Sequence, residues 1–141
     1  MKLILKLTIL LLLISCNEKS LTTRTHSSVF KSHKEKVEFL NKYVRKKSDY
    51  LNVEYNIIYH DNSTGMLTGP NDWDIKLKAT VDSKDISSWI IGCPKIATPT
   101  LNWSTIIVHT DDYQWYSNTK LITIGVHKEK NEVIYHYKTH L

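Results

Sequence analysis

The residues best suited to acid–base chemistry lie between positions 60 and 74. His60 and Asp61 are adjacent, and Asp72 and Asp74 follow after a stretch that contains two glycines and a proline. An imidazole oriented by a carboxylate is a common composition for a general base. The sequence has no Gly-x-Ser-x-Gly motif to supply a nucleophile. A small hydrolase that uses His60 with Asp61 or Asp72 is therefore one hypothesis. The alternative is that Asp61, Asn62 and Ser63 satisfy backbone amides of a loop, as such residues do in turns.

Two further histidines lie on segments that we expect to form a terminal hairpin. If the turn has two residues, His127 and His136 are diagonal neighbours on its outer face, with Gly125 opposite His136. A tetrahedral zinc site needs three or four ligands. His109 and His140 are conceivable additional ligands, but their spacing in the sequence does not support this. We therefore predict no metal site and no cofactor, with these histidines exposed on a strand.

The third candidate is a cluster of aromatic residues. Tyr113, Trp115 and Tyr116 follow Asp111 and Asp112 in a segment that we expect to be a loop between strands. Aromatic side chains with polar tips are typical anchors of protein interfaces. We therefore expect a recognition surface at these three aromatic residues. The alternative is that Trp115 and Tyr116 lie beneath the edge of the sheet.

The two cysteines have different settings. Cys93 lies between Gly92 and Pro94, and no basic cluster adjoins it to activate its thiol, so we expect a buried structural residue. Cys16 ends an N-terminal stretch that begins with Lys2 and Lys6 and continues with mostly apolar residues. That stretch is too short to cross a bilayer, which takes about 20 apolar residues, but it suits a secretory signal. We expect residues 1–15 to be a signal peptide.

The end of this stretch, Leu13-Ile14-Ser15-Cys16, resembles the lipobox of bacterial lipoproteins. The resemblance implies cleavage between Ser15 and Cys16 and acylation of the Cys16 thiol, which is the soft nucleophile that takes a diacylglycerol group. It also implies a lipid-anchored protein of the cell envelope, with the bilayer as its partner through Cys16. Asn17, in place of an Asp, favours the outer membrane if the source has one.

A second resemblance concerns the rest of the chain. His60-Asp61-Asn62-Ser63, Gly69-Pro70, Asp72-Trp73-Asp74 and the segment from Asp85 to Trp89 resemble small bacterial lipoproteins that have no assigned activity. The likeness covers about a quarter of the chain and implies no mechanism.

Charge is distributed unevenly along the chain. Residues 17–48 contain nine Lys and Arg against three Glu, whereas residues 49–141 contain eight Lys against eleven Asp and Glu. The basic part adjoins the expected anchor, so one hypothesis is that it lies against anionic lipid headgroups. The alternative is a solvated linker and helix surface. An exported protein meets little nucleic acid, so we expect no nucleic-acid partner despite a pI of about 9.1.

The elements that must position these residues follow from hydrophobic patterning. Residues 16–31 are polar and lack a period, which predicts a lipidated Cys16 followed by a flexible tether. Ser32 and Glu35 match a capping box, so we expect a helix over 33–48. Strands are predicted at 53–60, 73–81 and 103–109, and the 121–128 and 132–138 segments form the hairpin that turns at Lys130-Asn131. Asp82 precedes a short helix that ends at Gly92.

These elements predict a single α+β domain over residues 32–141, with an antiparallel sheet of about five strands and one or two helices on one face. We favour a membrane-anchored lipoprotein of unassigned activity, acting as a non-enzymatic binding module of the cell envelope. The alternatives are the hydrolase above and an immunity lipoprotein that protects its own cell from an exported toxin. A toxin gene beside this one would favour the latter.

Overall fold

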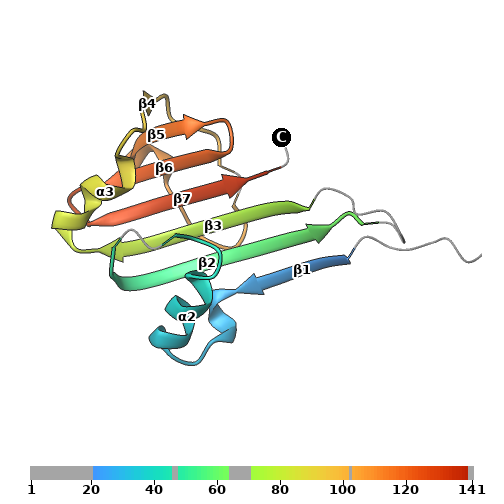
Figure 1. The fold of residues 1–141 in the computed structure, drawn as a ribbon. Helices are drawn as coiled ribbons and strands as arrows, with labels where there is room; N and C mark the ends of the chain where they lie inside the picture. The colour runs from blue at the N-terminus through green and yellow to red at the C-terminus, as the bar shows by residue number, and fades with distance from the viewer. Residues whose placement is uncertain (1–20, 46–47, 64–70, 102, 140–141) are drawn as a thin grey trace, which may run out of the picture.

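The computed structural model describes residues 21–45, 48–63, 71–101 and 103–139 (Figure 1). Within them the chain forms an α+β fold with a seven-stranded, fully antiparallel open sheet in the order β1-β2-β3-β7-β6-β5-β4. The strands are β1 (Leu21–His26), β2 (Tyr50–Asp61), β3 (Asp72–Val81), β4 (Lys95–Ile96), β5 (Gln114–Thr119), β6 (Ile122–His127) and β7 (Glu132–Lys138). The helices are α2 (His33–Leu40) and α3 (Ile86–Ile90), with short 3-10 turns η1 (Ser27–Val29), η2 (Ser83–Asp85) and η3 (Thr110–Asp112).

The α+β class and the antiparallel sheet are confirmed, but the sheet has more strands than the five or so expected. One added strand is β1, which occupies part of the segment predicted to be a tether. All six of its residues pair with β2, from Leu21 opposite Asp61 to His26 opposite Asn56. A polar Thr-rich strand can form here because β1 is an edge strand with largely exposed side chains. From Leu21 onward, the tether prediction is therefore wrong.

Helix α2 begins as the sequence predicts and ends earlier. The Ser32 side chain accepts from the Glu35 amide at 3.2 Å, and the Glu35 carboxylate accepts from the Ser32 amide at 3.1 Å, which completes the capping box. The helix ends at Leu40, because the Lys42 and Tyr43 amides bond to carbonyls three residues back and tighten the last turn. Residues 46–47 of the predicted helix lie outside the described residues.

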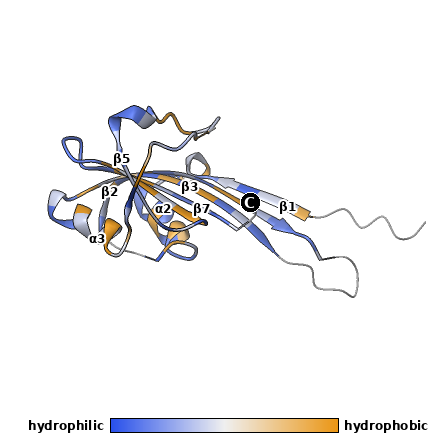
Figure 2. Ribbon diagram, turned by 90° about the horizontal axis from the view of Figure 1, so that it is seen from above, coloured by the Kyte–Doolittle hydropathy of each residue, from blue (hydrophilic) through white to orange (hydrophobic). Residues whose placement is uncertain are grey.

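The main hydrophobic core lies between the sheet and the two helices. The alternation predicted for β3 is confirmed, since Ile75, Leu77, Ala79 and Val81 all face this core. Trp89 of α3 is fully buried in the same core and donates from Nε1 to Ser48 Oγ at 3.1 Å. Figure 2 looks along the sheet and shows α2 and α3 on one side of it.

The terminal hairpin forms with a longer turn than expected. His127 pairs with Glu132 and Val126 with Val133, so four residues connect β6 and β7. Val126 therefore does not face Tyr135, as a two-residue turn would require. The register differs by two residues, which keeps every side chain on its predicted face because strand side chains alternate.

The opposite face of the sheet is partly covered by the irregular chain between β4 and η3 (Figure 2). The strand predicted at 103–109 does not form, and its apolar residues instead contact a second small core. Trp103 and Val108 pack there against Trp115 and Ile134, which point away from the helices. The strand prediction for this segment is thus wrong, and burial within the segment is mixed, since Ile106 is 1% exposed whereas Ile107 is 79% exposed.

Candidate functional site

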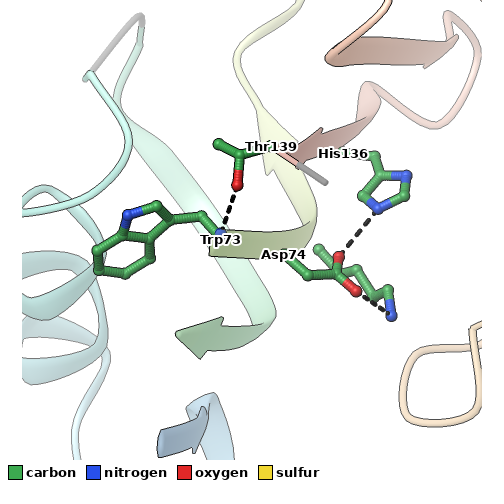
Figure 3. A network of polar contacts seen from close by, with 5 residues as sticks. Trp73, Asp74, His136 and Thr139 are labelled. Atoms are coloured by element: carbon green, nitrogen blue, oxygen red, sulfur yellow. Dashed lines mark hydrogen bonds and ion pairs between the residues drawn. The ribbon is translucent and has the colours of Figure 1, made fainter. Parts of the chain in front are cut away.

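A partly buried polar cluster lies on the sheet face that carries the irregular chain. Asp74 of β3 forms an ion pair with Lys76 of the same strand at 2.9 Å, and its other oxygen accepts from His136 Nε2 at 3.0 Å. Figure 3 shows the Asp74 carboxylate directed at the His136 ring of β7, while the Trp73 ring points to the other side. All three side chains of the cluster are less than one-fifth exposed.

The electrostatics of the cluster favour an ionised Asp74. Burial opposes ionisation, but the hydrogen bonds from His136 and Lys76 and the positive charge of Lys76 outweigh it, so the pKa of Asp74 is lowered. Both carboxylate oxygens are occupied by donors. The cluster therefore links two strands as a structural ion group, and Asp74 has no free oxygen directed at a substrate.

Polar residues continue across four strands next to this cluster. His26, Asn56, Lys76 and His136 are successive cross-strand partners, so their side chains lie on one face at spacings of about 5 Å. Among the described residues, His26 Nε2 and Asn56 Oδ1 are buried without a hydrogen-bond partner, as is Trp103 Nε1. The Trp103 ring meets His136 edge-on at 5.5 Å. Buried polar atoms rarely stay unpartnered in proteins, so this row of residues retains bonding capacity for a small polar group.

The sequence did not predict this combination of residues. Asp74 is one of the acid–base candidates above and His136 one of the possible metal ligands, whereas Lys76 belongs to neither group. The pairing of β3 with β7 brings Asp74 and His136 together across 62 positions of sequence. The polar alternation in β3 was the one available signal, but it does not reveal which strand is the neighbour.

The proposed hydrolase residues are placed near one another but are bonded elsewhere. His60 lies opposite Asp72 in the register, yet its Nδ1 is 2.9 Å from Thr22 Oγ1. Asp72 accepts from Asn62 at 2.7 Å, and Asp61 accepts from the amide and hydroxyl of Ser63. Hydrogen bonds from Ser63 lower the pKa of Asp61. The interpretation that these side chains satisfy loop amides is thus confirmed for Asp61, which accepts from the Ser63 amide.

The predicted aromatic surface is largely buried. Tyr113 and Trp115 belong to the second core, where Trp115 is only 1% exposed and donates from Nε1 to the Thr110 carbonyl at 2.8 Å. The Tyr113 hydroxyl donates to Glu132 at 2.7 Å, and burial together with this carboxylate raises its pKa. Tyr116 is half-buried against the main core. The expectation of an exposed recognition surface is therefore wrong for Tyr113 and Trp115, because the segment forms β5 instead of a loop.

The histidine pair of the hairpin is not assembled. His136 lies opposite Thr123 and bonds to Asp74, while His127 lies opposite Glu132 and meets the Tyr113 ring edge-on at 5.6 Å. The described residues include no group of three or more His, Cys, Asp or Glu that could hold a metal ion. Cys93 is half-buried, and its thiol lies 3.7 Å from the Ile91 carbonyl.

Three sequence-based expectations lie outside the described residues: the expected signal peptide 1–15, the expected cleavage site between Ser15 and Cys16, and Gly69-Pro70 of the loose resemblance. In the part of the chain that is described, every helix is too short or too polar to cross a membrane. Comparison with protein-family models, with curated proteins and with solved structures found no match.

Proposed function

We propose that this chain is an envelope lipoprotein, anchored to a bilayer through an acylated Cys16, whose domain binds a partner without catalysing a reaction. The observation that carries the anchor is the Leu13-Ile14-Ser15-Cys16 sequence after a basic and then apolar N-terminus. If the source has an outer membrane, Asn17 favours that membrane as the site of attachment.

The bonding of the acid–base residues supports a binding role over catalysis. Asp74 and His136 are committed to each other, His60 contacts Thr22, and Asp61 contacts Ser63. The hydrolase candidates His60, Asp61 and Asp72 each bond to a different partner, Thr22, Ser63 and Asn62, and not to one another as an oriented imidazole–carboxylate pair would.

The anchor is tested by a Cys16→Ala variant, with Cys93→Ala as the matched control. We expect native protein and the Cys93→Ala variant to sediment with membranes and to carry acyl chains on residue 16 by mass spectrometry. The Cys16→Ala variant should lose both properties. Membrane retention of an unmodified Cys16→Ala chain would contradict the proposal. Capture of a stoichiometric partner from solubilised envelopes would then support the binding role.

A further inference from the structure

The edge of the domain nearest the expected anchor differs in charge from the rest. Described residues 21–45 cover β1, η1, α2 and the following turn, and we call them the N-terminal edge. This edge contains only two acidic residues, Glu35 and Glu38. It contains six cationic residues: Arg24, Lys31, Lys34, Lys36, Lys42 and Arg45. The remaining described residues carry eight Lys against eleven Asp and Glu. The domain is therefore positive at the N-terminal edge and negative elsewhere.

Apolar side chains are exposed among these cationic residues. Leu21 is 65% exposed, Val29 is 66% exposed and Tyr43 is 40% exposed. Val29 also lines an open hollow of about 520 Å³, together with Phe30, Lys31, Glu35, Glu38, Phe39 and Lys42. The Lys42 ammonium lies 5.6 Å from the centre of the Phe39 ring. Lysines beside exposed aliphatic and aromatic side chains are typical of surfaces that rest in the headgroup region of a bilayer.

The position of this edge along the chain is the second argument. Leu21 follows Cys16 by five residues, and even a fully extended chain of that length spans only about 17 Å. Figure 1 shows β1 at the outer edge of the sheet, with the described chain beginning at one end of β1 and α2 lying near its other end. An acyl group on Cys16 would keep Leu21 within about 17 Å of the lipid surface, so the cationic residues of this edge could be brought into direct contact with the headgroups.

We propose that the N-terminal edge docks on an anionic bilayer surface, with Val29 and Tyr43 in the headgroup region and the negative remainder of the domain directed away from it. This inference rests on the proposed acylation of Cys16. Each cationic residue near an anionic surface favours contact by about fivefold, while the net negative part of the domain is repelled. The charge distribution thus selects one orientation, which leaves the irregular chain over the opposite sheet face free for a partner.

The test uses the acylated chain reconstituted into vesicles, with Cys93→Ser so that a single added cysteine can be labelled. A fluorescent label is placed at Val29→Cys or, as the matched control, at Ile107→Cys, since Ile107 is 79% exposed in the irregular chain. In vesicles that contain phosphatidylglycerol, we expect the label at 29 to be several-fold less accessible to an aqueous quencher than the label at 107. This protection should disappear in phosphatidylcholine vesicles and at about 1 M salt, where the Debye length is about 3 Å.

Charge variants test the electrostatic cause. Replacing Lys31 and Lys42 by Gln should shift the ratio of docked to undocked molecules toward the undocked state by about 25-fold. The matched replacement of exposed Lys120 and Lys128 by Gln removes the same charge from the far side of the sheet and should leave the ratio unchanged. Equal effects of the two pairs would overturn docking by the N-terminal edge.

The same sample separates the two proposals. If mass spectrometry finds the acyl group on Cys16 but the label at 29 is as accessible as the label at 107, the docked orientation is wrong and the anchor stands. If residue 16 carries no acyl group, both the anchor and the docking proposal fail. Protection at 29 in detergent without a bilayer would indicate contact between copies of the chain and would also overturn the proposal.

Discussion

The Asp74 carboxylate holds together side chains of two neighbouring strands, β3 and β7. Its two oxygens bond to Lys76 on the same strand and to His136 on the next strand, in surroundings that exclude most water. A carboxylate so placed is stabilised in its ionised form only while both cationic or polar donors remain. Removing its charge therefore affects the sheet more than the loss of an exposed surface ion pair would.

We predict that Asp74→Asn lowers the free energy of unfolding by about 2 kcal/mol at neutral pH, because Lys76 and His136 lose an anionic partner. The pKa of Asp74 is lowered by folding, so its contribution is present above the unfolded value of about 3.9 and is lost as pH falls through the folded value. The difference between wild type and variant should thus shrink below about pH 4. Urea unfolding at several pH values measures it.

The matched control for that prediction is Asp111→Asn, which changes an exposed carboxylate in η3. It should alter stability by less than about 0.5 kcal/mol. A loss as large as that of Asp74→Asn would show that the effect reflects net charge and not the cluster.

Gly125 gives a second prediction at the residue scale. A Cβ added there would lie 2.7 Å from Cζ3 and 2.8 Å from Cη2 of Trp115, whose ring is buried. Gly125→Ala should therefore destabilise the domain by about 1–3 kcal/mol through overpacking. In a Trp115→Leu background the added methyl group has room, so the penalty should fall, and a double-mutant cycle from denaturant unfolding measures this coupling. Equal penalties in both backgrounds would contradict the close contact.

At the scale of elements, α2 depends on its first turn. The capping box of Ser32 and Glu35 satisfies amides that a helix otherwise leaves free, and the Glu35 carboxylate also accepts from the Lys31 amide at 3.0 Å. The helix has only eight residues, so its own backbone bonds contribute little without the cap and the packing of Leu40.

We predict that Ser32→Ala lowers stability by about 1 kcal/mol, the usual cost of removing a capping hydroxyl. The control is Ser87→Ala, which changes an exposed serine inside α3 and should have an effect of less than about 0.5 kcal/mol. Thermal and denaturant unfolding give both values. Equal effects would mean that the cap does not stabilise α2.

On the scale of the whole molecule, β1 extends the folded domain to Leu21, five residues from the proposed anchor at Cys16. Ser27, directly after β1, is buried, and its hydroxyl accepts from the Tyr55 amide at 3.2 Å. The anchor segment and the folded domain are therefore connected by few residues, so the domain has a limited range of orientations at a membrane if Cys16 is acylated.

A chain that begins at residue 27 lacks β1 and tests this arrangement. We predict a loss of at least about 2 kcal/mol and a fall in Tm on the order of 10 °C, because β2 loses its outer partner. A chain that begins at residue 20 keeps β1 and should unfold at the same temperature as the chain from residue 16. If all three chains have the same Tm by calorimetry, residues 21–26 behave as a tether.

Local patterns in the sequence predicted local structure well. The capping box at Ser32, the alternation of β3 and the hairpin of β6 and β7 each depend on residues close together in sequence, and all three are confirmed. The Leu13–Cys16 pattern likewise predicts the anchor from adjacent residues, and it remains a prediction. Periodicity and capping act over a few positions, so a single sequence expresses them directly.

The tertiary structure decided which elements are neighbours. The pairing of β3 with β7 created the Asp74–His136 contact, and burial beneath the irregular chain turned Trp115 from an expected surface anchor into a core residue. The polar strand β1 forms because β2 offers it a free edge, which its own composition does not indicate. Contacts between distant segments depend on the free energy of the whole packed sheet, and no short stretch of this sequence carries that information.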